Sequence, residues 1–289
     1  MSFAQTIVLG ALAGLTIYLG LPLGRLQMVS KRGRVALAMF SVGVLAFVFV
    51  DVSLHGLEIL EKGVNGLKGA HPTRSLGEVV LLVVLMGAGF AAGSAGLGIL
   101  ERRMRPQARP LPPVAGGSAA ATITPTHADA LAAEADLARR RALRTGLTIA
   151  GAIGIHNFAE GLAIGVSARA GEISLATVLI VGFALHNATE GFGIVGPLGD
   201  VKPSWRWLGL AGLIGGGPTF IGSLVGYNVT SEPLELAFYA LAGGAILYVI
   251  GEVWNAMRRY GHRELGLSLL TAGFIVGVVT DLVVQYGGG

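Results

Sequence analysis

Residues 35–56 read VALAMFSVGVLAFVFVDVSLHG, and this stretch decides the class of fold. Its only charged side chain is Asp51, and as a helix it would be about 33 Å long, close to the roughly 30 Å of a bilayer's hydrocarbon core. Other stretches of about 20 residues share this character. We expect transmembrane helices at 4–24, 35–56, 77–100, 143–167, 173–197, 207–228, 234–256 and 265–286. The sequence therefore predicts an all-α integral membrane protein with eight transmembrane helices.

The composition of the whole chain agrees with a membrane protein. Of the 289 residues, 53% are hydrophobic and only 13% are charged, against about a quarter in soluble domains, which excludes a soluble globular enzyme. The chain contains no cysteine, so iron–sulfur clusters and thiolate zinc sites are excluded as well. The first apolar stretch has no lysine or arginine before it and is too long for a signal-peptide core, so we expect it to span the membrane.

Lysine and arginine are distributed unevenly along the chain. All but four of the 21 fall in the loops after the first, third, fifth and seventh stretches; the exceptions are Lys62, Lys68, Arg74 and Arg169. Because cytoplasmic loops carry the excess of basic residues, these four loops are predicted to be cytoplasmic and both termini extracytoplasmic. The basic charge thus reports topology, and no nucleic-acid partner is needed to explain it.

One long connection divides the helices. We expect helices one to three in 1–100, a cytoplasmic linker in 101–142 that ends in a short helix over 128–141, and helices four to eight in 143–289, all within a single transmembrane domain. The linker contains only one histidine, His127, so we do not expect it to gather metal ions.

A polar hexapeptide occurs twice within the apolar stretches. The motif His-Asn-x-x-Glu-Gly begins at His156 and again at His186, so that Glu160 and Glu190 each follow a histidine by four residues. On a helix this spacing places both side chains on one face. The link between the two stretches is short, so the helices should be antiparallel neighbours with the two faces turned together.

Two imidazoles and two carboxylates form a ligand set for a divalent cation. Without thiolate, such a set favours Zn²⁺, Fe²⁺, Mn²⁺ or Cd²⁺ over Cu⁺. Two ionised glutamates carry a charge of −2, which one divalent ion cancels. A lone histidine in a membrane helix is more often an interhelical hydrogen-bonding residue. Here the duplication at identical spacing, and the absence of a lysine or arginine at that depth, favour a metal site.

These motifs give the chain its resemblance to a known family. The eight spans, the long loop after the third and the paired motifs resemble the ZIP (Zrt/Irt-like) family of divalent metal transporters, especially its prokaryotic branch. The resemblance implies an inverted-repeat architecture, a homodimer and an elevator-like motion in which helices 1, 4, 5 and 6 move past helices 2, 3, 7 and 8. It also implies that the duplicated motif supplies the primary metal site, with ligands His156, Glu160, His186 and Glu190.

The resemblance extends to other acids and to one departure. Glu252, in a segment similar to the family's seventh helix, would assist binding or release near the site, and Asp281 falls where members often keep an acid near the outer entrance. Many relatives have a second metal site with two carboxylates at positions that are Asn187 and Gly217 here, so we expect one tightly bound metal. Asn157 and Asn187 remain candidates for weak or indirect ligands.

Two further features carry open interpretations. Asp51 and His55, one turn apart near the outer end of their helix, form either a metal entrance or a solvated helix end. The run Gly215-Gly216-Gly217-Pro218 predicts either a local break of its helix beside a cavity or a packing kink.

The predicted function is a transporter, in the cell (inner) membrane, that moves Zn²⁺ or a similar divalent cation into the cytoplasm, and it is not an enzyme. The alternative is an intramembrane metal-dependent hydrolase with an open position for water on the metal. Against it, the chain lacks a His-Glu-x-x-His helix, and four protein ligands leave no vacancy. A metal sensor or a channel is a third possibility.

Overall fold

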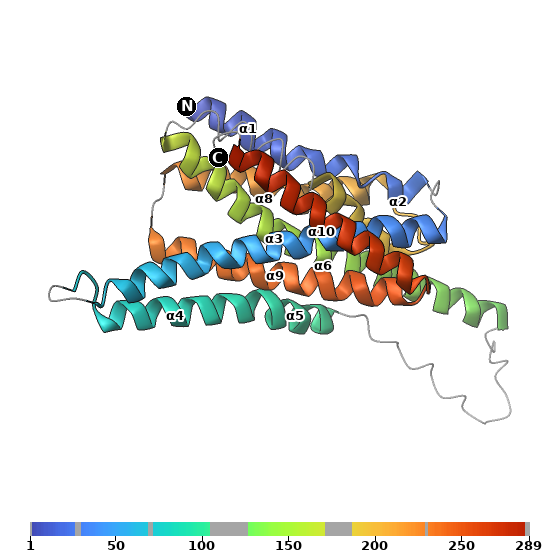
Figure 1. Cartoon of the computed structure of the whole chain (residues 1–289). Coiled ribbons are helices and arrows are strands. Elements are labelled where there is room, and N and C mark those ends of the chain that lie inside the picture. The colour runs from blue at the N-terminus through green and yellow to red at the C-terminus, as the bar shows by residue number, and fades with distance from the viewer. Residues whose placement is uncertain are drawn as a thin grey trace, which may run out of the picture.

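The computed structural model describes residues 2–26, 30–68, 72–104, 127–170, 187–228 and 231–286. Within these residues the chain is helical and contains no strand. Its helices lie roughly side by side as a bundle (Figure 1). The long elements are α1 (Phe3–Leu15), α3 (Lys31–Asn65), α4 (Leu76–Ala91), α5 (Leu97–Met104), α6 (His127–Ala170), α8 (Trp205–Asn228), α9 (Glu232–Arg258) and α10 (Arg263–Tyr286), with a further helix over 187–195.

Six of the predicted spans are confirmed as helices that are long and apolar enough to cross a membrane, among the residues that the structure describes. They are Phe3–Arg25, Lys31–Asn65, Leu76–Leu100, Trp205–Asn228, Glu232–Arg258 and Arg263–Val283. Helix α6 contains the fourth predicted span, but its apolar part is interrupted by the polar motif at His156–Glu160. The fifth span, 173–197, falls on described residues only from 187 onward.

Two helices differ from their predicted form at their ends. Helix α3 continues beyond residue 56 to Asn65, because Ile59 and Gly63 keep one face of this extension against Leu82 of α4. The first span is interrupted: α1 ends at Leu15, a 3₁₀ turn η1 (Thr16–Leu19) follows, and a short α2 (Leu23–Leu26) begins after Pro22. In this segment backbone hydrogen bonds join residues three positions apart, such as Gly20 N–H to the Ile17 carbonyl and Gly24 N–H to the Leu21 carbonyl, and Pro22 has no N–H to donate.

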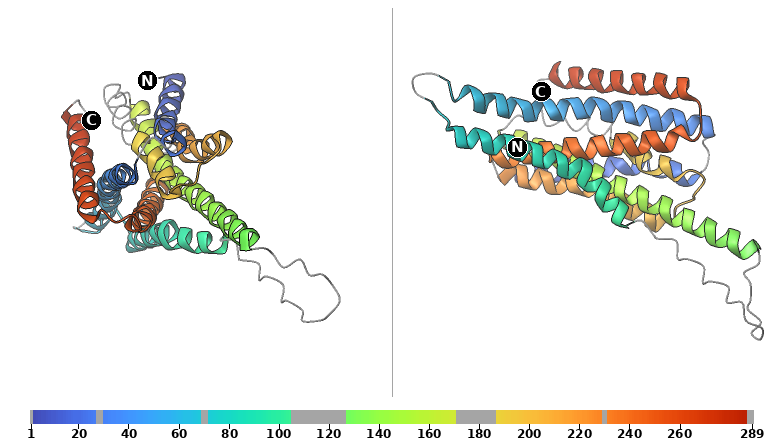
Figure 2. Two further views of the ribbon diagram at one scale, coloured as in Figure 1. Left: turned by 90° about the vertical axis from the view of Figure 1, so that its right-hand side faces the viewer. Right: turned by 90° about the horizontal axis from the view of Figure 1, so that it is seen from below.

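The linker helix and the fourth span form one element. Helix α6 runs without interruption from His127 to Ala170, so the helix expected over 128–141 is continuous with the membrane helix. Its first turns project beyond the bundle (Figures 1 and 2). Residues 105–126 of the predicted linker lie outside the described residues, and the division into 1–100, 101–142 and 143–289 stays a prediction.

The basic residues gather at one end of the bundle. In Figure 1, α2, the end of α5, the start of α6 and the turn between α9 and α10 lie at the same end. These are the segments that contain or adjoin Arg25, Arg102, Arg103, Arg139, Arg258 and Arg263. The described helix ends that adjoin three of the loops predicted to be cytoplasmic thus lie at one end of the bundle.

The helices pack as two groups, which we call the carrier group (α1, η1, α6, residues 187–195 and α8) and the wall group (α3, α4, α9 and α10). Viewed along the bundle, α3 and α10 lie on one side of α6, and α1 and α8 on the other (Figure 2). The most extensive helix contact, between α6 and α8, is inside the carrier group, and those of α3 with α10 and α9 are inside the wall group. Helix α6 also contacts α9, which joins the two groups.

Candidate metal site

The polar motif of α6 lies in the interior of the bundle. His156 and Asn157 are fully buried and Glu160 is 6% exposed. The i,i+4 spacing brings Nε2 of His156 to 2.8 Å from Oε1 of Glu160, so this pair shares one face of the helix as predicted. Burying ionisable groups at this depth is costly unless they neutralise one another or hold an ion.

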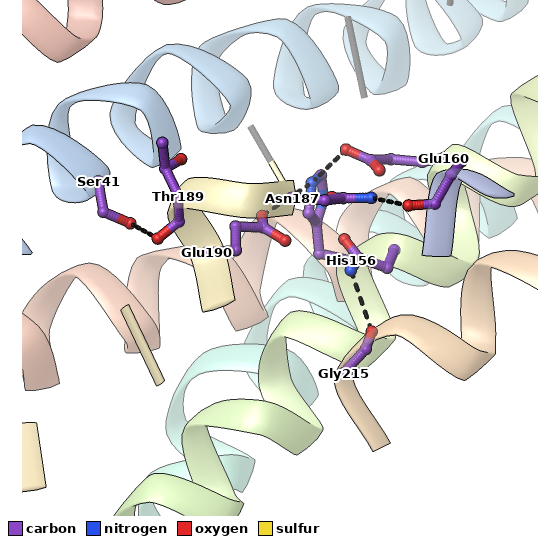
Figure 3. A network of polar contacts seen from close by, with 9 residues as sticks. Ser41, His156, Glu160, Asn187, Thr189, Glu190 and Gly215 are labelled. Atoms are coloured by element: carbon purple, nitrogen blue, oxygen red, sulfur yellow. Dashed lines mark hydrogen bonds and ion pairs between the residues drawn. The ribbon is translucent and has the colours of Figure 1, made fainter. Parts of the chain in front are cut away.

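The second copy of the motif turns toward the first. Glu190, in the helix over 187–195, is fully buried, and its Oε1 lies 3.9 Å from Nε2 of His156 (Figure 3). The structure therefore brings together three of the four predicted ligands: His156, Glu160 and Glu190. The fourth, His186, lies one position outside the described residues.

The three side chains converge without forming a finished coordination shell. Among the described residues, no set of three histidine or acidic side chains is arranged as metal ligands. Zinc–nitrogen and zinc–oxygen bonds of about 2.0–2.1 Å place tetrahedral ligand atoms roughly 3.3 Å apart. The observed 2.8 and 3.9 Å lie on either side of this separation. The three side chains as they stand are therefore close to, but not at, the separations of tetrahedral ligands.

The two motif asparagines are tied to neighbouring helices by backbone hydrogen bonds. Nδ2 of Asn157 donates to the carbonyl of Gly215 in α8 at 3.0 Å, and Nδ2 of Asn187 donates to the carbonyl of Ala13 in α1, also at 3.0 Å. Each amide oxygen is buried and accepts no hydrogen bond from the described residues. A buried acceptor without a donor is uncommon, and an amide oxygen beside a cation site can bind the ion weakly or through water.

Of the two expectations for the glycine–proline run of α8, the structure contradicts the local break of the helix. The helix continues from Trp205 to Asn228 with Pro218 inside it, so the predicted local break is wrong. Pro218 has no N–H for the carbonyl of Ile214, the residue four positions earlier. That carbonyl instead lies against Gly154 of α6, where the lack of a side chain lets the two backbones approach.

The structure adds one polar residue that the sequence analysis did not select. Thr219 of α8 is fully buried, and its hydroxyl has no hydrogen-bond partner among the described residues. It packs beside Gly14 of α1 and Gly161 of α6. No spacing pattern in the sequence singled it out.

The predicted entrance residues lie on the wall group. Asp51 and His55 of α3 are 3.6 Å apart between Oδ1 and Nδ1, and both side chains are partly exposed. Asp281 of α10, the third predicted entrance residue, is half-buried. The role of these three residues at an entrance stays a prediction.

Glu252 does not belong to the contacts just described. It is half-buried in α9, one residue before the buried Val253 and close to Trp254 and Arg258 at the basic end of the bundle. Its part in binding or release stays a prediction.

Comparisons with known proteins identify relatives over most of the chain. A family model described as "ZIP Zinc transporter" matches residues 118–250, a range that includes the whole duplicated motif. The chain is 31% identical over 159 residues to the zinc transporter ZupT of Clostridium perfringens, across 52% of this chain and 54% of that protein. It is 27% identical over 293 aligned positions to the zinc transporter ZupT of Corynebacterium aurimucosum, across 97% of this chain and 96% of that protein.

Proposed function

Because this chain belongs to the ZIP zinc transporter family, we propose that it carries Zn²⁺ or a similar divalent cation across the cell membrane into the cytoplasm. Members of the family are transporters, so the prediction that the chain is not an enzyme is confirmed, and the hydrolase alternative has no support. The described residues fit a multi-pass membrane protein, with six candidate spans among them.

The observation that carries the proposal is the buried cluster of His156, Glu160 and Glu190. Two carboxylates and an imidazole from different segments meet inside the bundle, with exposed fractions of 6% or less. The structure describes three arginine ion pairs: Arg34–Asp200 and Arg74–Glu232 lie near helix ends, and Arg140–Asp136 lies on the exposed first part of α6. A divalent ion would neutralise both carboxylates and remove the cost of burying their charge.

We place His186 in the same site as the fourth ligand. It immediately precedes Asn187, whose side chain is fixed by its hydrogen bond to α1, and it stands one turn before Glu190 in the motif. With it, the site would hold one tightly bound ion through two imidazoles and two carboxylates. Asn157 and Asn187 would support the site through their amide oxygens.

The packing of the two helix groups supports an elevator-like movement. A Cβ added to Gly154 or Gly161 would collide with the backbone of α8, and one added to Gly273 would collide with that of α3. Such backbone-to-backbone contacts occur inside the carrier group and inside the wall group. Between the groups, the described glycines meet side chains instead: Gly193 faces Ser41 Oγ, and Gly196 faces the Cβ of Ala38. Two tightly packed groups with a looser contact between them can slide.

Two further expectations from the family resemblance belong to the proposal. The orientation has the basic end in the cytoplasm, both termini outside and the halves arranged as inverted repeats. The homodimer would form through the wall group, where α4 and α10 expose apolar side chains such as Val84 and Val279. Light scattering of the purified protein, corrected for detergent, tests whether the chain is a dimer.

Zinc uptake into proteoliposomes tests the function and the site together. Glu190→Gln should abolish most of the uptake and lower the zinc content of the purified protein from about one ion per chain toward zero, because it removes one charged ligand. The matched control is Glu58→Gln, on an exposed position of α3. Full uptake by Glu190→Gln would exclude the site, and absence of zinc uptake by the wild-type protein would exclude the function.

A further inference from the structure

A cavity lies at the basic end of the wall group, away from the buried metal cluster. It has a volume of about 430 Å³ and lies between the start of α3, the end of α9 and the start of α10. Its inner surface includes Val35 and Met39 of α3 and Met257 of α9, each at most 3% exposed. The cavity therefore has an apolar floor that belongs to the packed core.

The rim of the same cavity is cationic. Arg258 comes from the last turn of α9 and Arg263 from the first turn of α10, with His262 between them, and none of the described residues that line the cavity is acidic. Both arginines are exposed, and neither makes an ion pair in the part of the chain that the structure describes. Two unpaired guanidinium groups beside one opening favour an anion, and phosphate oxygens suit their hydrogen-bonding geometry.

The turn between α9 and α10 brings both arginines to the lining of the same cavity. Gly261 and His262 both have positive φ, 73° and 57°, and His262 is the only described residue other than glycine with this conformation. The carbonyl of His262 then accepts the backbone N–H of Gly266, which starts the first turn of α10. This tight reversal brings the ends of the helices together.

The location of the cavity indicates which class of anion it would bind. It is lined by residues of the turn between α9 and α10, which lies at the end of the bundle where the basic residues gather (Figure 1). Trp254 also lines it, and aromatic residues are common at the level of lipid headgroups. Leu267 also lines the cavity and is 41% exposed. The cavity lining is therefore continuous with the apolar outer face of α10. An acyl chain could follow this apolar path, whereas a free phosphate would use only the rim.

We propose that this cavity binds an anionic phospholipid of the leaflet at the basic end, with the phosphate between Arg258 and Arg263 and one acyl chain on the apolar floor. Basic pockets between transmembrane helices on the cytoplasmic side suit such headgroups. The inference depends on the membrane location of the chain and not on the metal site. The bound phospholipid would anchor the wall group to the bilayer.

Native mass spectrometry of the full-length protein, with added phosphatidylglycerol or phosphatidylcholine, tests the proposal. The wild-type protein should retain phosphatidylglycerol in preference to phosphatidylcholine. The double variant Arg258→Gln/Arg263→Gln should weaken this retention at least about fivefold per arginine, in line with roughly 1 kcal/mol for each basic side chain at an anionic surface. The control Arg102→Gln/Arg103→Gln removes the same charge at the same end, outside the cavity, and should retain the lipid.

A second variant keeps both arginines and fills the cavity. A Cβ on Gly266 would already lie 3.3 Å from Met39, so Gly266→Leu should occupy the floor and also reduce retention of phosphatidylglycerol. Thermal unfolding without added lipid establishes that each variant is folded. Equal losses in the two double variants would show diffuse attraction of charge and overturn the proposal. Equal retention of both lipids, or full displacement by millimolar inorganic phosphate, would overturn it as well.

Discussion

At the scale of single residues, Asn157 joins the site to the neighbouring helix. Its amide nitrogen is committed to the carbonyl of Gly215, which fixes the direction of its amide oxygen. It also stands beside His156 in a motif where every polar side chain is buried. A residue that orients or supplements metal ligands typically changes metal affinity by 10–100-fold when it is removed.

We therefore predict that Asn157→Leu lowers zinc affinity by about tenfold or more while the protein stays folded. The measurement is a competition titration of the purified variant against a zinc-chelating dye. Asn228→Leu is the control, because Asn228 also donates to a backbone carbonyl, that of Leu224, but at the exposed end of α8. Unchanged affinity in Asn157→Leu would separate this asparagine from the metal.

At the scale of helices, the contact between α6 and α8 depends on glycines, whose lack of a side chain lets the two backbones approach closely. Gly161 faces the backbone of Thr219 and Ser223 so closely that no Cβ fits between them, whereas Gly151 on the same helix has open space at its Cβ position. Small residues at membrane helix interfaces allow this approach.

Gly161→Ala should consequently separate the two helices and destabilise the protein by about 1–3 kcal/mol, the usual cost of overpacking. Gly151→Ala should leave stability unchanged or raise it slightly, since alanine is the better helix former. Thermal unfolding in detergent compares the two variants. A similar midpoint for both would mean that the helix contact tolerates a shift.

The sequence predicted the elements better than their details. The apolar runs located the helices because the thickness of the bilayer sets their length, and the duplicated spacing predicted that His156, Glu160 and Glu190 would meet. The extension of α3 could not be predicted, because Ile59 and Gly63 are placed by contact with α4 rather than by local hydropathy. The continuity of α8 through Pro218 likewise depends on packing against α6. Thr219 went unselected because a single threonine carries no spacing pattern.

At the scale of the whole molecule, the boundary between the carrier and wall groups can be locked chemically. A Cβ on Gly193 would lie 3.1 Å from Oγ of Ser41 across this boundary, and one on Gly243 would lie 3.7 Å from Oγ of Ser53 inside the wall group. In a disulfide each Cβ lies about 3 Å from the sulfur of its partner, so the first separation suits a cross-link directly and the second requires a small side-chain adjustment. The chain has no cysteine of its own to interfere.

Oxidation of Ser41→Cys/Gly193→Cys should stop zinc uptake, and a reducing agent should restore it, because the disulfide holds the two groups in one relative position. The control Ser53→Cys/Gly243→Cys should form its disulfide and keep transporting. Uptake by the oxidised cross-boundary variant would rule out a sliding movement at this boundary.

The orientation of the molecule can be read from two exposed positions at opposite ends. In intact cells, a membrane-impermeant maleimide should label Lys62→Cys, at the end of α3 away from the basic loops, and should label Arg259→Cys only after permeabilisation. The reverse pattern would invert the proposed topology and the direction of the transport path.

Because α6 is unbroken, its exposed first part can report how far the proposed metal site moves. At about 1.5 Å per residue, its 44 residues extend roughly 66 Å, about twice the thickness of the hydrocarbon core. His156, Glu160 and the protruding first turns belong to this one helix. In the proposed elevator-like movement, a displacement of the site along the membrane normal should therefore be accompanied by a displacement of Arg140, on the exposed first part of α6. A spin label there would let the stroke be followed from outside the bilayer, without touching the metal.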